Sequence, residues 1–252
     1  MSATGKGLPP PWVTRIGVIV GLLMVWEVLG RMGTALFFSP LSKVVISGHQ
    51  IFFEAEVRQA LLTTGWVLAL AFLLSLILGL ILGLAIAMSK FTYQTFMPVL
   101  LLLYAIPQIT ILPLFVLYFG NGPASKIAFG VSHGLFPVAV SVIAGVQGIK
   151  PILLTSAASM GATRAQIFRR ITLPYLVPSL FTGMRLASTA ALLGVLLAEL
   201  YASAGGVGHF TRRFSETFQP DKLYALIGAL ALMAIALNEA MRRLERRFSK
   251  WR

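Results

Sequence analysis

The sequence contains no cysteine and little charge. The absence of cysteine excludes disulfide bonds and thiolate metal sites, and it leaves the redox compartment open. Charged residues make up 12% of the 252 residues, whereas soluble globular domains carry about 25%. Hydrophobic residues make up 57%. The composition therefore excludes an ordinary soluble domain and indicates a protein that folds in a membrane.

Acidic residues are especially scarce. The chain has 8 Asp and Glu against 21 Lys and Arg, which gives a formal charge of +13. In a soluble protein this imbalance would suggest nucleic acid as a partner. Here the basic residues mostly flank apolar runs, so we expect no nucleic-acid binding and interpret the charge as a signal of membrane topology.

Apolar runs of about 20 residues recur along the chain, and each is long enough to cross a hydrocarbon core of ~30 Å. We expect one all-α transmembrane domain over residues 1–252, with about six spans. The third run contains Pro107 and Pro113, which predict a kink or break. The six runs are residues 15–33, 61–88, 93–119, 124–147, 176–203 and 223–241.

The distribution of basic residues predicts the orientation. With six spans both termini lie on one side, and that side holds 13 Lys and Arg against seven on the other. The positive-inside bias therefore places both termini and the segment 148–175 in the cytoplasm. The segment 39–60, on the opposite side, has the pattern of an amphipathic helix at the outer interface.

The segment 148–175 is the most informative part of the sequence. We expect two short helices joined by a turn at Gly161, with small residues before the glycine that permit close approach by another protein. Pro174 permits a helix to begin in its first turn. The second short helix has an apolar side formed by Ile167, Phe168 and Ile171.

This segment resembles the EAA loop of binding-protein-dependent ABC importer permeases. The loop pattern is Glu-Ala-Ala, three residues, Gly, nine residues, Ile, one residue, Leu-Pro. The positions with matching spacing are Gly161, Ile171, Leu173 and Pro174. The opening departs from the pattern, because Thr155, Ser156 and Ala157 stand where the family has Glu-Ala-Ala. The departure removes an acidic residue and with it one docking contact.

The resemblance implies a coupling helix that sits in a groove of a cytoplasmic ATPase subunit and passes its closure to the spans. A short rigid helix between two spans can transmit rigid-body motion. The alternative is an ordinary amphipathic loop that lies on the membrane. The coupling residues implied are Thr155, Ser156, Ala157, Gly161, Ala162, Ile167, Phe168, Ile171, Leu173 and Pro174.

Further fragments, in the same order and spacing, are similar to the nitrate, sulfonate and taurine group of these permeases. They are Trp26-Glu27, Pro40, Ala105-Ile106-Pro107, Phe119-Gly120, Lys126, Phe136-Pro137, Gly183 to Arg185, Ala198-Glu199-Leu200 and Gly205 to Gly208. The resemblance implies the type I importer fold in the bacterial inner membrane, with a small solute delivered by a periplasmic or lipid-anchored binding protein.

The resemblance also implies the partners. Two copies of the chain would form the pathway within membrane lipid, and ABC ATPase subunits would bind below. The sequence has no Gly-x-x-x-x-Gly-Lys-[Ser/Thr], so we expect ATP and Mg²⁺ on a separate subunit. We expect no catalytic residue, cofactor or metal on this chain.

Three polar residues near the proline break are candidates for the substrate pathway. His133 interrupts an apolar run, and Gln108 and Thr110 flank Pro107. Histidine can bind an anion or titrate, although a membrane histidine also serves helix packing.

Four ionisable residues lie in or near the spans, where each is costly unless it is paired or reached by water. Two of them, Arg185 and Glu199, are also candidates for the substrate pathway. For Arg185 we weigh attraction of an anion against bonds to carbonyls of the 148–175 loop. For Glu199 we weigh a gate against a pair with Arg212 or Arg213. Glu27 and Glu239 fit helix packing.

Two other functions remain as alternatives. A gated channel would work without an ATPase. Co-purification of the chain with an ATPase subunit would distinguish the importer from the channel. An intramembrane enzyme needs a nucleophile with a base or paired acids on the spans, but His-Glu-x-x-His is absent and the acids are scattered.

Overall fold

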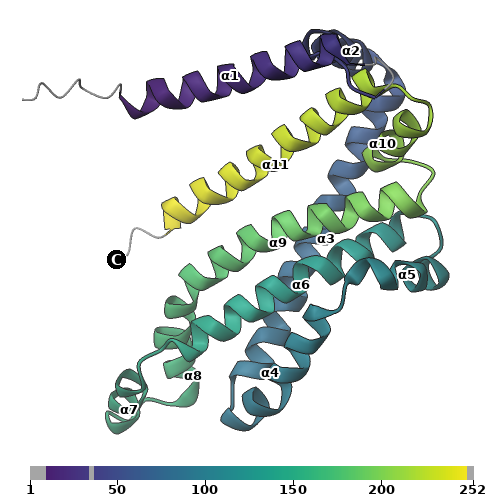
Figure 1. Cartoon of the computed structure of the whole chain (residues 1–252). Coiled ribbons are helices and arrows are strands. Elements are labelled where there is room, and N and C mark those ends of the chain that lie inside the picture. Colours follow the sequence, from purple (N-terminus) through teal and green to yellow (C-terminus); the bar gives the residue numbers. More distant parts are fainter. Residues whose placement is uncertain (1–9, 34–36, 249–252) are drawn as a thin grey trace, which may run out of the picture. The chain divides into compact units, whose positions relative to one another are not determined.

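The structure is a computed structural model that describes residues 10–33 and 37–248 (Figure 1). Lys6, Lys250 and Arg252, which contribute to the predicted topology, lie outside the described residues. Every regular element in the described ranges is helical, which confirms the predicted all-α class.

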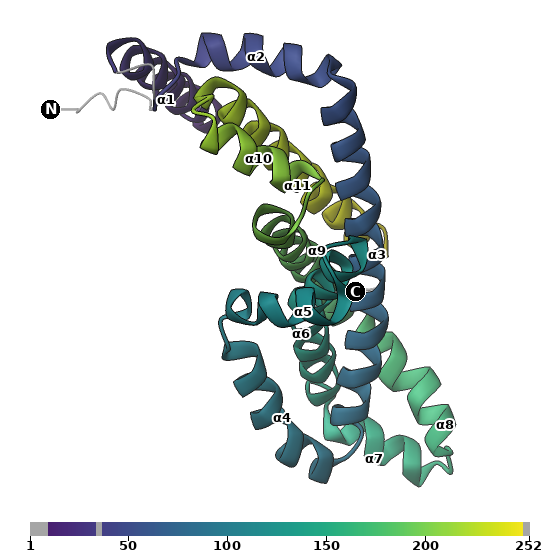
Figure 2. The same ribbon diagram turned by 90° about the vertical axis from the view of Figure 1, so that its right-hand side faces the viewer.

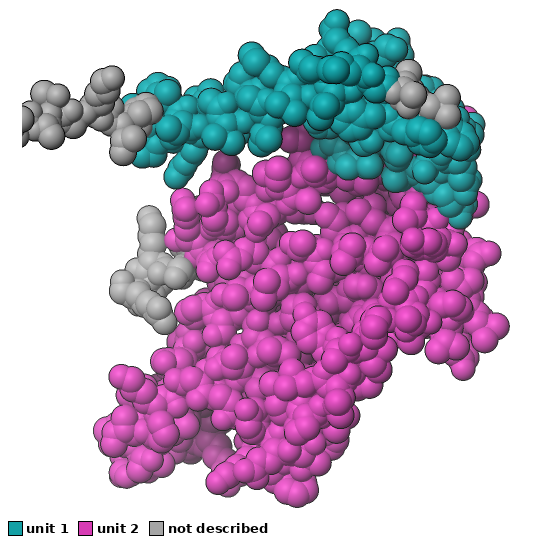
Figure 3. Space-filling view, in the orientation of Figure 1, with its two compact units in different colours: residues 1–55, 211–229 teal, residues 56–210, 230–252 magenta. Residues whose placement is uncertain are grey.

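The chain forms two compact units, which are coloured separately in Figure 3. Unit 1 comprises residues 1–55 and 211–229, and unit 2 comprises residues 56–210 and 230–252. Two helices, α10 (Val207–Glu216) and α11 (Pro220–Phe248), contribute residues to both units.

Unit 1 contains α1 (Pro11–Met32) and α2 (Leu41–Phe53). Glu27 of α1 joins them, because its carboxylate accepts hydrogen bonds from the backbone N–H and the hydroxyl of Ser42, each at 2.9 Å. The Ser42 N–H belongs to the first turn of α2, which lacks a partner within the helix. Glu27 therefore serves packing, as predicted, and α2 confirms the helix expected within 39–60.

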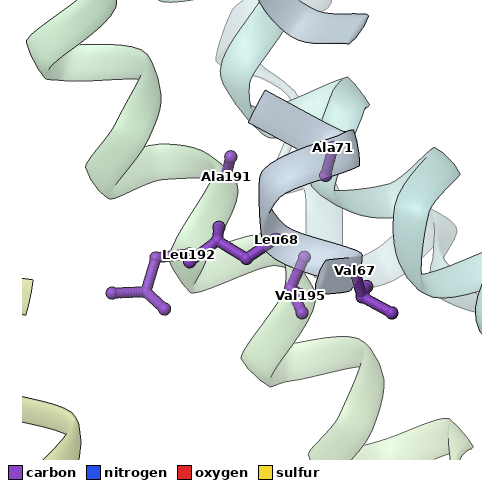
Figure 4. Packing of buried hydrophobic residues seen from close by; sticks show 6 residues of the cluster. All are labelled: Val67, Leu68, Ala71, Ala191, Leu192 and Val195. Atoms are coloured by element: carbon purple, nitrogen blue, oxygen red, sulfur yellow. The ribbon is translucent and has the colours of Figure 1, made fainter. Parts of the chain in front are cut away.

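Unit 2 is built on α3 (Ala55–Ala87), α6 (Pro123–Gln147) and α9 (Leu173–Ala202) (Figure 2). Figure 4 shows one part of its core, where alanine, leucine and valine side chains of α3 and α9 pack together. These residues are Val67, Leu68, Ala71, Ala191, Leu192 and Val195.

Small residues set how closely the three helices pack. A Cβ at Gly145 of α6 would lie 2.8 Å from Ser179 of α9, and a Cβ at Gly130 would lie 2.7 Å from Val195. The early part of α6 thus meets the late part of α9, so the two helices are antiparallel. Small residues at such positions allow membrane helices to approach closely.

The proline-containing third run is broken, as predicted. Helix α4 (Lys90–Ala105) ends before Pro107, a 3₁₀ turn η1 (Gln108–Ile111) follows, and α5 (Leu112–Phe119) continues at an angle of 82° to α4. Proline has no N–H to donate and disfavours a helical residue before it, so the chain turns there. Within the described ranges five helices can span a membrane, and this pair makes the sixth when it is counted as one span.

The remaining helices of unit 2 connect α6 to α9. They are α7 (Pro151–Ser159), α8 (Arg164–Ile167) and the π-helical turn η2 (Phe168–Thr172). In Figures 1 and 2 they lie at the same end of unit 2 as the α3–α4 connection. Lys90 and the segment 148–175 thus share one end, as the predicted topology requires.

Candidate functional site

The turn between α7 and α8 has a fixed backbone geometry. Gly161 has a φ of +81°. Its N–H donates to the carbonyl of Ala158 at 2.9 Å, and the N–H of Ala162 donates to the carbonyl of Ala157 at 3.0 Å. This pair of bonds is the Schellman motif that ends a helix on a left-handed residue. The predicted helix–turn–helix is present, with Gly161 in the left-handed position that glycine tolerates best.

Helix α8 begins with a capping box. The hydroxyl of Thr163 accepts a hydrogen bond from the N–H of Gln166 at 3.3 Å, and the side chain of Gln166 accepts from the N–H of Thr163 at 2.8 Å. The pattern Thr-x-x-Gln can be read from the sequence, but our sequence reasoning missed it. Only residues 160–162 separate this cap from the end of α7, so both helices are fixed relative to the turn.

The π-helical turn η2 lies just before Pro174, which occupies the first turn of α9. A proline ring clashes with the carbonyl four residues earlier and gives that carbonyl no N–H partner. We attribute the wider turn at residues 168–172 to this clash, because π turns commonly accommodate such local irregularities. The sequence did not predict the π turn, although it placed the start of α9 correctly.

Much of the segment is exposed. Thr155 and Ser156 lie on the surface of α7, and the Thr155 hydroxyl donates to the carbonyl of Pro151 at 3.1 Å. Ala157 is buried beneath the turn. The second helix and the start of α9 contribute half-buried Ile167 and Ile171, together with the exposed residues Phe168, Leu173 and Pro174.

Two of the three pathway candidates near the proline break belong to one polar cluster. The side chain of Gln108 donates to the carbonyl of Ser132 at 3.2 Å, and its oxygen lies 3.2 Å from the Ser132 hydroxyl. Nδ1 of His133 lies 3.4 Å from the same hydroxyl. Thr110 is exposed and turns its hydroxyl to the carbonyl of Pro107 at 2.7 Å, so it does not join the cluster.

His133 presents one free ring nitrogen. Nδ1 lies 3.0 Å from the carbonyl of Phe129, and because a carbonyl only accepts, Nδ1 carries the proton. Within the described chain no buried side-chain nitrogen or oxygen lacks a partner, and Nε2 of His133 makes no hydrogen bond. Nε2 is therefore accessible. It accepts a hydrogen bond in neutral imidazole and donates one only in imidazolium.

Residues Gly130 to Gly134 read Gly-Val-Ser-His-Gly, which matches the Gly-x-Ser-x-Gly pattern of a nucleophile elbow. Our sequence reasoning took this pattern to be absent, which is wrong. A nucleophile elbow is a strained strand-to-helix turn, but this stretch lies inside α6. The Ser132 hydroxyl bonds to the carbonyl of Phe129 at 2.7 Å, and a carbonyl rather than a carboxylate orients His133. The arrangement of a hydrolase triad is not formed.

Glu199 is fully buried in unit 2, so it does not line an open gate in this structure. Its carboxylate lies 3.5 Å from Nζ of Lys126 and accepts hydrogen bonds from the Thr64 hydroxyl at 2.9 Å and the Gly208 N–H at 3.0 Å. Our sequence reasoning did not consider Lys126 as its partner. The network joins α3, α6 and α9 to the loop that follows α9.

The glycines after α9 make room for this carboxylate. Gly206 has a φ of +100°, and a Cβ there would overlap the Glu199 carboxylate. Lys126 is itself buried and donates to the carbonyl of Gly205 at 2.6 Å. Removal of one partner from a buried ion pair costs roughly 3–5 kcal/mol. The network therefore strongly stabilises the conformation of the loop that follows α9.

Arg185 pairs with an acidic residue, a contact that we did not weigh from the sequence. Its guanidinium lies 3.7 Å from the carboxylate of Glu245 in α11, not on carbonyls of the 148–175 segment. Arg185 also lines a hollow of about 420 Å³ together with Asn238, Glu239 and Arg242. Glu239 in turn pairs with Arg242 and Arg243 of its own helix.

Comparison with known proteins identifies the family. Residues 75–250 match the model of the family described as "Binding-protein-dependent transport system inner membrane component". The taurine transport system permease protein of Escherichia coli (strain K12) is 30% identical over 243 residues, which cover 94% of this chain and 88% of that protein. The formylaminopyrimidine transport permease protein of Halalkalibacterium halodurans is 30% identical over 237 residues, which cover 92% of each chain.

Solved structures agree on the fold. A chain of a bacterial ABC transporter involved in the import of the acidic polysaccharide alginate superposes with a TM-score of 0.69 at 17% identity, over 95% of this chain and 96% of that one. The fold is that of a type I ABC importer transmembrane domain. The chain belongs to the family of binding-protein-dependent transport system inner membrane components, as a permease subunit of an ABC importer whose ATPase is a separate subunit.

Proposed function

We propose that two copies of this chain form the translocation pathway of an importer for a small sulfonate-type or similarly small polar solute. The taurine permease of Escherichia coli, which aligns over almost the whole chain, supports a sulfonate. The formylaminopyrimidine permease, at the same identity, supports the wider class of small polar solutes. In this proposal the external binding protein selects the solute, and membrane lipid surrounds the pair.

The observation that carries the proposal is the fixed geometry of α7, the Gly161 turn and α8. The Schellman motif and the capping box leave little freedom between the two helices. This short rigid body connects α6 to α9, the antiparallel pair at the core of unit 2. Displacement of the segment by a closing ATPase would therefore move α6 and α9 as rigid elements.

The proposal also assigns an orientation and a pathway. The segment 148–175 and both termini face the cytoplasm, because the basic residues are concentrated on that side. The polar cluster of Gln108, Ser132 and His133, with Thr110 nearby on η1, faces the solute. The accessible Nε2 of His133 supports this assignment, since it leaves one hydrogen-bonding atom available to a polar solute.

Reconstitution tests the proposal. The chain is purified with its ATPase subunit, placed in liposomes, and assayed for ATP hydrolysis with the external binding protein and taurine or an alkanesulfonate. We expect ligand-loaded binding protein to stimulate hydrolysis and uptake together. Uptake that proceeds without an ATPase would instead establish a channel. If only an unrelated solute stimulates hydrolysis and uptake, the sulfonate assignment is refuted and the importer assignment stands.

A further inference from the structure

The segment 148–175 carries charge of one sign only. It contains Lys150, Arg164, Arg169 and Arg170 and has no Asp or Glu. All four basic side chains are exposed. None of them takes part in an ion pair within the described chain. By contrast, Arg31, Arg185, Arg242 and Arg243 elsewhere in the chain each have an acidic partner.

Two of these arginines line a hollow together with Ala165 and Gln166. Its volume is about 580 Å³, and the lining residues Arg169 and Arg170 lie in η2. The side-chain oxygen of Gln166 is already held by the Thr163 N–H, so its NH₂ is the group left to bind a partner. Guanidinium and amide N–H groups are donors, and they match carboxylate oxygens.

The same segment exposes apolar side chains beside its charge. Met160, directly before the Gly161 turn, is 82% exposed, and Ile152 at the start of α7 is 66% exposed. Apolar anchors combined with arginine are typical of protein interfaces. A lipid headgroup surface requires only positive charge, whereas this segment combines arginines with exposed apolar side chains beside a capped turn.

We infer that the ATPase subunit presents an acidic docking surface to this segment, with carboxylates that pair with Arg169 and Arg170. The inference rests on the proposed coupling role of the segment. Guanidinium groups buried at an interface without a counter-charge are strongly unfavourable, and this segment supplies no carboxylate of its own. Thr155 occupies the position where the resembled loop has its acidic residue, so this segment offers only positive charge to a partner.

The test measures how much ATPase subunit co-purifies with the full-length permease from membranes. Arg169→Gln with Arg170→Gln neutralises the pair, and Arg169→Glu with Arg170→Glu reverses it. The matched control reverses Lys43 and Arg58, two exposed basic residues outside the segment, by Lys43→Glu with Arg58→Glu. We expect retention of the ATPase to fall about tenfold in the neutralised variant, further in the reversed one, and little in the control.

Two further measurements separate the possible outcomes. Wild-type retention should weaken as salt rises, because salt screens the long-range attraction between the basic segment and an acidic surface. A Lys substitution at one acidic position of the ATPase should restore binding to the reversed variant. Equal retention in all variants would overturn the acidic surface. Unchanged ATPase retention with lost binding to vesicles of anionic lipid would assign the arginines to the membrane. A wild-type permease that retains no ATPase would instead refute the proposed function.

Discussion

Replacement of Gly161 tests whether the turn acts through its backbone or through close contact with a partner. The left-handed conformation costs a residue with a side chain roughly 1–2 kcal/mol. This free energy corresponds to a roughly 5- to 30-fold change in the equilibrium between the formed and the unformed turn. Among the described residues nothing lies within 4 Å of a Cβ at this position. A methyl group at 161 therefore meets backbone strain but no clash within the described residues.

A series of three substitutions separates strain from contact. Gly161→Ala adds strain with a small side chain, Gly161→Asn adds a larger side chain that tolerates this conformation, and Gly161→Leu adds both strain and bulk. If the ATPase approaches the turn closely, binding should fall in the order Gly, Ala, Asn, Leu. If strain alone matters, Asn should behave like Gly, and Leu should be no worse than Ala.

The assay compares membrane level, ATPase co-purification and ligand-stimulated ATP hydrolysis for each variant. We expect all three variants to insert normally, because lipid and helix packing hold the spans. Gly161→Leu should lose the ATPase or lose stimulation. An intact, fully stimulated Gly161→Leu complex would refute the coupling role, and a series in which Asn equals Gly would refute close contact while retaining the rigid turn.

Three other expectations follow from the structure. His133→Leu should impair uptake while leaving assembly intact, because it removes the accessible Nε2, and normal uptake kinetics would exclude His133 from the pathway. Glu199→Gln should lower the thermal stability of the detergent-solubilised protein by the equivalent of roughly 3–5 kcal/mol, because Lys126 then loses its counter-charge in a buried site. The double variant with Lys126→Met should recover part of that loss. Strictly additive losses from the two substitutions would contradict the pairing. A single thiol from Arg164→Cys, the only one in the chain, should resist impermeant reagents in intact cells, and labelling there would reverse the proposed orientation.

The features that the sequence predicted well are those with local causes. Pro107 has no N–H to donate and disfavours a helical residue before it, and the turn at Gly161 follows from a glycine between two helical stretches. Apolar runs of sufficient length predicted the spans, because the hydrocarbon core sets their length. Even local signals were missed when they were not sought, as the cap formed by Thr163 and Gln166 shows.

Pairings between residues far apart in the chain could not be predicted from the sequence. Glu199 and Lys126 are 73 residues apart, and nothing in their local sequences indicates that α6 and α9 turn these side chains toward each other. The same holds for Arg185 and Glu245. Such pairs depend on the rotation and register of whole helices, which small residues such as Gly130 and Gly145 set through close packing.

A cross-linking experiment tests the central claim that the α7–α8 turn docks on an ATPase. The chain has no cysteine, so Met160→Cys places one thiol beside the turn, where the native side chain is 82% exposed, and a photoreactive group can be attached there. Lys43→Cys, in unit 1, is the control. We predict that Met160→Cys cross-links to the ATPase subunit in the assembled complex and that Lys43→Cys does not. Cross-linking of the ATPase from the control alone, or of lipid alone from position 160, would contradict the account.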